Sequence, residues 1–307
     1  MNKSTKPLHT NTPLILSSPL STKDRNVWLK MEALQPAGSF KNRGIGVACQ
    51  HYVANGAKRL ISSSGGNAGI ATAYCGMMLG VPVSVVVPKN APETVIAAMR
   101  RFGADVQIHG ALWPEAHQKA LELVNETNVL IHPFDDPLIW PGHATLIDEV
   151  VAANCIPDAV VHSVGGGGLL CGVTQGLKRN NLAAVPVVAV ETSGAASMNA
   201  AMRKGELVTL DSIDTIANTL GAKRVAEAAF EASQEFNVSS VVVSDKQALN
   251  ACYRFLDDHR VMVEPSCGAA LAAIYDDVTE LQDKANILVV VCGGMGVSLA
   301  QLNAWSS

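Results

Sequence analysis

The sequence lacks any uninterrupted apolar run of the roughly 18 to 20 residues that a membrane-spanning helix needs, because glycine and polar residues break every candidate. The N-terminal segment MNKSTKPLHTNTPLILSS also lacks the continuous apolar core of a secretory signal. The seven cysteines form no Cys-x-x-Cys pair, and their odd number does not suit a disulfide framework. We therefore expect a cytoplasmic protein whose thiols are reduced and mostly packed inside.

Charge is also scarce. Only 16% of the residues are charged, the net charge is −4, and the 23 lysines and arginines are scattered along the chain. Such a chain offers no basic surface for a phosphate backbone, so nucleic-acid binding is not expected. In contrast, 48% of the 307 residues are hydrophobic, which is typical of a well-buried α/β protein of about two domains.

Short β-branched runs alternate with helix-length segments rich in alanine and leucine. This alternation predicts an α/β fold with mostly parallel sheets covered by helices on both faces. The expected helices include 68–79, 114–125 and 246–257. The expected strands are 59–63, 83–87, 105–108, 158–164, 187–190, 241–244 and 287–291.

Glycine clusters follow three of the expected strands, at Gly65-Gly66, Gly165–Gly168 and Gly293-Gly294. Ligands of open parallel sheets bind beyond the carboxyl ends of the strands. No linker or internal repeat separates the clusters, so two domains would be packed tightly or one would be inserted into the other. We therefore expect the functional site between two domains.

The four consecutive glycines at Gly165–Gly168 stand between a strand and a helix. Backbone N–H groups there can converge on one phosphate, and the helix dipole adds partial positive charge. The segment has no Gly-Lys-Ser/Thr ending of a nucleotide P-loop, and the G-x-G-x-x-G spacing of a dinucleotide site fails at Leu170. A phosphate-binding turn is favoured over a packing turn, and a nicotinamide dehydrogenase is disfavoured.

Three further segments contain groups suited to chemistry. Lys41 lies in Gly-Ser-Phe-Lys-Asn-Arg-Gly and could form a Schiff base with an aldehyde cofactor, although a lysine that opens a helix is usually a surface charge. The turn at 62–69, Ser-Ser-Ser-Gly-Gly-Asn-Ala-Gly, offers N–H groups, a hydroxyl and an amide for a carboxylate, but reads equally well as a helix cap. Cys292, taken alone, is a small core residue.

Together the four segments resemble the fold-type-II pyridoxal-phosphate enzymes and, within them, the serine dehydratases (L-serine/L-threonine ammonia-lyases). The resemblance covers nearly the whole chain, including WLKMEALQPAGSFKNRGI, SSGGNAGIATAY, PFDDPLIWPGHA, SVGGGGLLCGV, AVETSGAASMNAA, VEPSCGAALAA and VVVCGGMGVSLAQL. It implies a small domain, residues 35–138, inserted into a large cofactor-binding domain formed by residues 1–34 and 139–307. It also implies elimination of water and ammonia from L-serine, L-threonine or both, giving pyruvate or 2-oxobutanoate.

The resemblance further implies roles for individual residues. Lys41 would carry pyridoxal 5′-phosphate and act as the base, with Phe40 against the pyridine ring, Asn67 at the 3′ oxygen and Cys292 at the ring nitrogen. The phosphate would lie on Gly165, Gly166, Gly167, Gly168 and Leu169. The substrate carboxylate would lie on Ser64, Gly65, Gly66, Asn67 and Ala68. A monovalent cation such as K⁺ would be held by Gly165, Glu191, Ala195, Ser197, Leu220 and Ala222, since oxygen ligands suit a hard cation. A homodimer is the family's usual assembly.

Other activities of the same cofactor stay open. A cysteine-synthase-like β-replacement enzyme is one, although those enzymes carry Thr-Ser-Gly-Asn-Thr-Gly where this chain has Ser-Ser-Gly-Gly-Asn-Ala-Gly. A non-catalytic member that binds an amino acid is another, and the intact Lys41 and glycine turn count against it. Gly65 replaces the alanine of mammalian liver serine dehydratases and the serine of serine racemases, so a second base for racemisation is missing. Gly293-Gly294-Met295-Gly296 also departs from the mammalian pattern in its last two residues.

Overall fold

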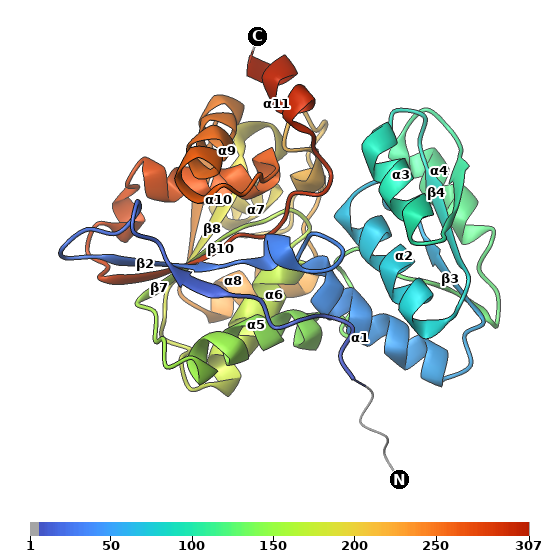
Figure 1. The fold of residues 1–307 in the computed structure, drawn as a ribbon, viewed down its shortest axis with the longest axis horizontal. Coiled ribbons are helices and arrows are strands. Elements are labelled where there is room, and N and C mark those ends of the chain that lie inside the picture. Colours follow the sequence, from blue (N-terminus) through green and yellow to red (C-terminus); the bar gives the residue numbers. More distant parts are fainter. Residues whose placement is uncertain (1–5, 307) are drawn as a thin grey trace.

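The computed structural model describes residues 6–306, which form two parallel sheets, each covered by helices (Figure 1). The larger sheet has the strand order β1-β2-β10-β7-β8-β9, and only β1 runs antiparallel to its neighbour. Its strands are β1 (Leu14–Leu16), β2 (Asn26–Lys30), β7 (Ala159–Ser163), β8 (Val187–Thr192), β9 (Val238–Val243) and β10 (Asn286–Val290). The predicted α/β fold with mostly parallel sheets is confirmed.

Helices lie on both faces of this sheet, with α9 and α10 on one side and α5, α6 and α8 on the other (Figure 1). Both faces are apolar because the central strands are continuous runs of β-branched residues, as in Ile287–Val291, all of which are fully buried. The helices of this part are α5 (Trp140–Ala152), α6 (Gly168–Arg179), α7 (Ser197–Lys204), α8 (Glu227–Glu235), α9 (Asp245–His259), α10 (Pro265–Tyr275) and α11 (Leu299–Ser306). The 3-10 turns are η2 (Ser193–Ala195), η3 (Asn218–Leu220) and η4 (Thr279–Leu281).

The smaller sheet is wholly parallel, with the strand order β5-β4-β3-β6. Successive residues of β3 and β4 enter different hydrophobic clusters: Leu60 and Val85 pack in one with α1 and α2, whereas Ile61 and Val86 pack in the other with α4. This is the period-2 alternation of a strand buried on both faces. The strands are β3 (Arg59–Ser62), β4 (Val83–Val87), β5 (Asp105–Ile108) and β6 (Asn128–Leu130), and the other elements are η1 (Glu32–Leu34), α1 (Lys41–Ala54), α2 (Asn67–Leu79), α3 (Glu93–Arg101) and α4 (Trp113–Leu121).

Most of the expected elements are confirmed, several with bounds that differ by one or two residues, and two differ at one end by three residues or more. The strand expected at 241–244 begins three residues earlier, at Val238, because as an edge strand of the large sheet it accommodates half-exposed serines. The helix expected at 114–125 ends at Leu121, because the Asn125 side chain accepts from the backbone N–H groups of Thr127 and Asn128 and forms a turn. The domain boundaries at 34/35 and 138/139 remain a prediction.

All seven cysteines are free and buried, as expected. Among the helices of residues 6–306, none is long and apolar enough to cross a membrane.

Candidate active site

Lys41 is the first residue of α1, and two backbone hydrogen bonds hold the segment before it against the end of β10. The Phe40 N–H donates to the carbonyl of Cys292 at 3.0 Å, and the Gly294 N–H donates to the carbonyl of Gly38 at 3.2 Å. Gly38 has a φ of +72°, a conformation that a β-carbon disfavours, so the turn into α1 requires glycine. Two of the glycine-containing segments singled out in the sequence thus pair directly.

The Lys41 ammonium is buried and makes one close polar contact. Its Nζ donates to the carbonyl of Pro133 at 2.5 Å and lies 5.0 Å from the centre of the Phe40 ring. Burial lowers the pKa of Lys41 to about 8, and the nearby Cys292 opposes this shift. About a tenth of this amine is therefore unprotonated at pH 7, far more than for an ordinary lysine, and a nucleophile or base must be unprotonated.

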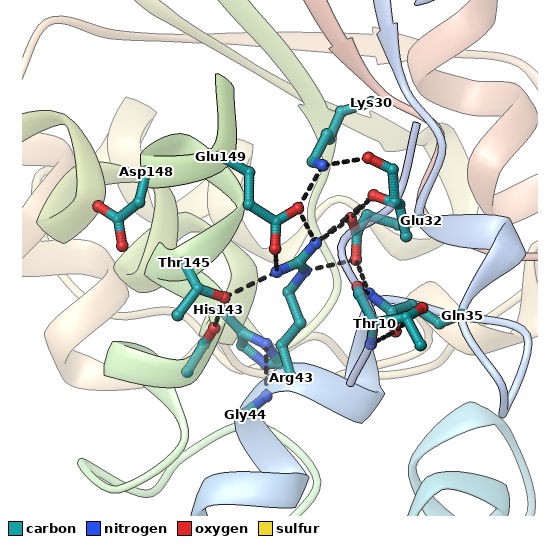
Figure 2. Close-up of polar contacts among 12 residues, drawn as sticks. Thr10, Lys30, Glu32, Gln35, Arg43, Gly44, His143, Thr145, Asp148 and Glu149 are labelled. Atoms are coloured by element: carbon teal, nitrogen blue, oxygen red, sulfur yellow. Dashed lines mark hydrogen bonds and ion pairs between the residues drawn. The ribbon is translucent and has the colours of Figure 1, made fainter. Parts of the chain in front are cut away.

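A buried ion-pair network stabilises the first turn of α1, which contains Lys41 (Figure 2). Arg43 is fully buried and donates at 2.7 and 2.8 Å to Glu32 and at 2.7 Å to both oxygens of Glu149. Lys30 on β2 joins the network through Glu149 at 2.5 Å. The network connects α1 to β2 and α5, so it holds in place the backbone of Lys41, two residues before Arg43. The sequence analysis did not identify these charges.

The four-glycine turn lies between β7 and α6 and passes close to Phe134. A β-carbon on Gly166 would lie 2.3 Å from atoms of the Phe134 ring, and one on Gly168 would lie 2.7 Å from the Phe134 carbonyl oxygen. Gly167 has a φ of +91° and precedes α6, which begins without a side-chain cap. Because the first N–H groups of a helix have no partner within it, this uncapped end is suited to an anion.

The predicted carboxylate loop, Ser64–Ala68, connects β3 to α2. Gly66 has an extended backbone and caps α2 without a side-chain hydrogen bond. A β-carbon on Gly66 would lie 3.3 Å from the Thr219 methyl group, whereas one on Gly65 would meet only Ala91 at 3.5 Å and Val87 beyond it. The loop therefore faces η3, which belongs to the part of the chain that forms the larger sheet.

Asn67 is held by a carboxylate from the other half of the chain. Its Nδ2 donates to Glu264 Oε1 at 2.7 Å, and Thr219 donates to the same oxygen at 2.6 Å. Burial raises the pKa of Glu264, while the hydrogen bonds from Thr219 and Asn67 oppose the rise. Within the described chain, Asn67 Oδ1 is buried and has no hydrogen-bond partner. Glu264 and Thr219 were missed in the sequence analysis, although VEPSCG was among the segments that carried the resemblance.

Cys292 follows β10 and is buried against Cys267. A hydrogen bond with Cys267 and burial both raise the pKa of the Cys292 thiol. The thiol is therefore neutral at physiological pH and is a weak donor, not an anion.

The residues expected to bind a cation fall into two groups. Gly165 approaches η3, because a β-carbon on it would lie 3.1 Å from Leu220 Cα, and the Ala222 N–H donates to the Leu220 carbonyl. Ala195 ends η2, just before α7. Glu191 is fully buried, accepts from the N–H groups of Met198 and Asn199 at 2.8 and 2.7 Å, and has its pKa raised by burial to about 7. Ser197 Oγ is buried without a partner among the described residues. In residues 6–306 no three His, Cys, Asp or Glu side chains gather in a metal-binding group.

The sequence analysis also missed the loop after β6. His132 Nδ1 accepts from the N–H groups of Phe134 at 3.3 Å and Asp135 at 2.7 Å. This loop supplies the Pro133 carbonyl that meets Lys41 and the Phe134 ring that covers the glycine turn. PFDDPLIWPGHA carried part of the resemblance, but a carbonyl acceptor leaves no signal in a sequence.

Proteins of similar sequence and fold are known. The mouse (Mus musculus) protein "L-serine dehydratase/L-threonine deaminase" is 46% identical over 309 aligned residues, covering 97% of this chain and 94% of the mouse protein. The crystal structure of a fungal L-serine ammonia-lyase from Rhizomucor miehei superposes with a TM-score of 0.94 at 36% identity, covering 98% of this chain and 99% of the fungal one. A maize serine racemase superposes with a TM-score of 0.88 at 26% identity, covering 98% and 92% of the two chains.

The family model described as "Pyridoxal-phosphate dependent enzyme" matches residues 5–293. That range contains the Lys41 turn, the carboxylate loop, the four-glycine turn and Cys292. The chain therefore belongs to the pyridoxal-phosphate-dependent enzyme family.

Proposed function

We propose that this protein eliminates water and ammonia from L-serine, giving pyruvate, and from L-threonine, giving 2-oxobutanoate, with pyridoxal phosphate linked to Lys41. The observation that carries the proposal is the buried Lys41 amine, with a pKa lowered to about 8, where the two sheets' glycine-rich loops meet. The mouse relative is similar in sequence and the fungal one in fold, each over nearly the whole chain, and both are named for this reaction.

The residues around Lys41 fit the cofactor in three respects. The pKa of the amine is lowered toward neutrality, which favours the unprotonated form that Schiff-base formation requires. The uncapped start of α6 suits a phosphate, and Gly166 and Gly168 allow Phe134 to pack against this turn where β-carbons would clash with it. Asn67 Oδ1 is a buried polar atom that lacks a partner in the part of the chain described, and such an atom requires one when the site is complete.

We assign the residues to roles on this basis. Phe40 and Cys292 would contact the pyridine ring and its nitrogen, Asn67 the 3′ oxygen, and Gly165 to Leu169 the phosphate. When bound, the cofactor supplies an electron sink for negative charge at the substrate α-carbon. Because the Cys292 thiol is neutral and only a weak donor, it would not fix a full proton on the ring nitrogen.

The chain's own groups would position the substrate and move its proton. The backbone N–H groups of Ser64 to Ala68, at the uncapped start of α2, would bind the α-carboxylate. Lys41 Nζ, once free, would remove the α-proton. Gly65 has no hydroxyl that could act as a second base, and this favours elimination over racemisation.

Three finer features belong to the same proposal. A monovalent cation such as K⁺ would bind among Gly165, Glu191, Ala195, Ser197, Leu220 and Ala222. The buried Ser197 hydroxyl, which has no hydrogen-bond partner within residues 6–306, supports this site. Replacing K⁺ by tetramethylammonium in the assay would lower activity. The protein would form a homodimer, which light scattering would test. It would work in the cytoplasm, where its seven thiols stay reduced.

A lactate-dehydrogenase-coupled assay with each amino acid tests the main proposal. Keto acid should form with the unaltered protein and with Lys23→Ala, whose side chain is 89% exposed, but not with Lys41→Ala. Borohydride reduction followed by peptide mass spectrometry should place the cofactor on Lys41. Keto acid from Lys41→Ala at the wild-type rate would refute the assignment. Formation of cysteine in place of keto acid when sulfide is added would indicate β-replacement instead.

A further inference from the structure

His132 lies directly after the smaller sheet, in the loop between β6 and α5, and its ring organises that loop. Its Nδ1 accepts two backbone N–H groups, from Phe134 at 3.3 Å and from Asp135 at 2.7 Å. A nitrogen that accepts carries no proton, so the proton of the neutral ring lies on Nε2. The Phe134 ring packs edge-on against the imidazole, with centroids 4.8 Å apart.

The peptide unit that His132 holds is the one that faces Lys41. The Pro133 carbonyl and the Phe134 N–H belong to the same planar trans peptide, so they point in opposite directions. When Nδ1 fixes the Phe134 N–H on one side, the Pro133 oxygen is fixed on the other, where Lys41 Nζ donates to it at 2.5 Å. The orientation of this one peptide thus depends on an acceptor at His132.

We propose that His132, in its neutral form, is a positioning residue that orients the Pro133–Phe134 peptide and thereby holds the free amine of Lys41. Protonation of His132 would place an N–H at Nδ1, opposite two other N–H donors, and would release the peptide. The inference rests on the proposed function, because it assigns a partner to the lysine that binds the cofactor.

The groups around His132 determine the pH at which the peptide is released. Burial lowers the pKa of His132 from 6.5, and the charges of Lys41 and His117 act in the same direction, while Asp135 and Asp136 oppose them. Since the pKa is lowered on folding, the ordered loop is fully present above pH 6.5 and is lost as the pH falls through the lower value.

Two substitutions of His132 distinguish the effect of its hydrogen-bond acceptor from the effect of its protonation. Asparagine offers an oxygen that accepts from the N–H groups two and three residues on, as in an Asx turn, but it does not titrate. His132→Asn should therefore keep the wild-type kcat/KM at pH 8 and lose the additional fall below pH 6.5 that protonation of His132 adds to that of Lys41. His132→Leu has no acceptor and should lower kcat/KM about tenfold at pH 8, the usual effect of losing a hydrogen bond that orients a charged group. Its difference from the wild type should shrink at low pH, where His132 of the wild type is protonated as well. His109→Asn, an exposed histidine after β5, is the control and should match the wild type.

A second measurement does not depend on turnover. In each holoenzyme, the fraction of cofactor linked to Lys41 is fixed by borohydride between pH 5 and 9 and measured by peptide mass spectrometry. It should fall more steeply below pH 6.5 in the wild type than in His132→Asn, and it should be reduced at pH 8 in His132→Leu. A fall below pH 6.5 that is as steep in His132→Asn as in the wild type, or a wild-type profile in His132→Leu, would overturn the inference. If no keto acid forms but the trapped fractions behave as stated, the proposed function fails and the positioning role stands.

Discussion

Replacement of Arg43 by methionine tests whether the buried charge network behind the active site stabilises the protein (Figure 2). Arg43 and Glu32 are fully buried, and the guanidinium makes paired hydrogen bonds at 2.7 to 2.8 Å to Glu32 and to Glu149. Methionine fills a similar volume but leaves Glu32 without its cation. Breaking a buried pair from one side costs about 3–5 kcal/mol, which corresponds to a fall in Tm of roughly 5–8 °C for a chain of this size.

Differential scanning calorimetry and urea denaturation would measure this loss, with Arg179→Met as the matched control. Arg179 also pairs with an α5 carboxylate, Asp148, but both side chains are about 40% exposed, so its loss should cost less than about 1 kcal/mol. Adding Glu32→Met to Arg43→Met should recover part of the stability, because the uncompensated charge is removed. An Arg43→Met protein as stable as Arg179→Met would refute the reasoning.

The same network predicts a pH dependence of stability. Burial favours a raised pKa for Glu149, but hydrogen bonds and charge from Arg43, together with Lys30, outweigh it and lower the pKa below 4.5. The stabilisation is therefore complete above pH 4.5 and is lost as the pH falls through the lower, folded-state value. The difference in Tm between wild type and Arg43→Met should shrink over that range, and a constant difference would contradict the ion-pair account.

Three further predictions concern the site itself. Gly166→Ala places a β-carbon 2.3 Å from the Phe134 ring, so it should cost about 1–3 kcal/mol of stability and weaken cofactor binding. Thermal unfolding and absorbance titration with pyridoxal phosphate would measure these two effects. Unchanged values would show that the turn has room for a β-carbon. A β-carbon at Gly65→Ala would meet Ala91 at 3.5 Å and Val87 beyond it, so the substitution should alter stability by less than about 0.5 kcal/mol. It should nevertheless shift the ratio of kcat/KM for serine to that for threonine. An unchanged ratio would show that Gly65 does not determine substrate specificity. Because a base must be unprotonated and burial lowers the pKa of Lys41 to about 8, kcat should rise with pH and level off above 8; a profile flat from pH 6 to 9 would contradict this role.

The features that the sequence determined are those encoded by neighbouring residues. Runs such as Val83–Val87 and Ile287–Val291 predict strands buried on both faces, and they are confirmed. Three strands were not predicted. β1 and β6 have only three residues each, too few for a periodicity to emerge, and β2 has only three apolar residues between polar ends. Glycines at strand ends predicted a shared site, because the carboxyl ends of parallel strands lie at one edge of a sheet.

Only the tertiary structure decided which groups meet around Lys41. The Pro133 carbonyl lies 92 positions from Lys41 along the chain, and Glu264 lies 197 positions from Asn67. Carbonyl acceptors look alike in every residue, and a glutamate before a helix is ordinarily a surface charge, so neither carries a local signal. A sequence pattern reports the conformation that a few adjacent residues prefer. The pKa of a buried amine depends instead on which distant atoms the folded chain places around it.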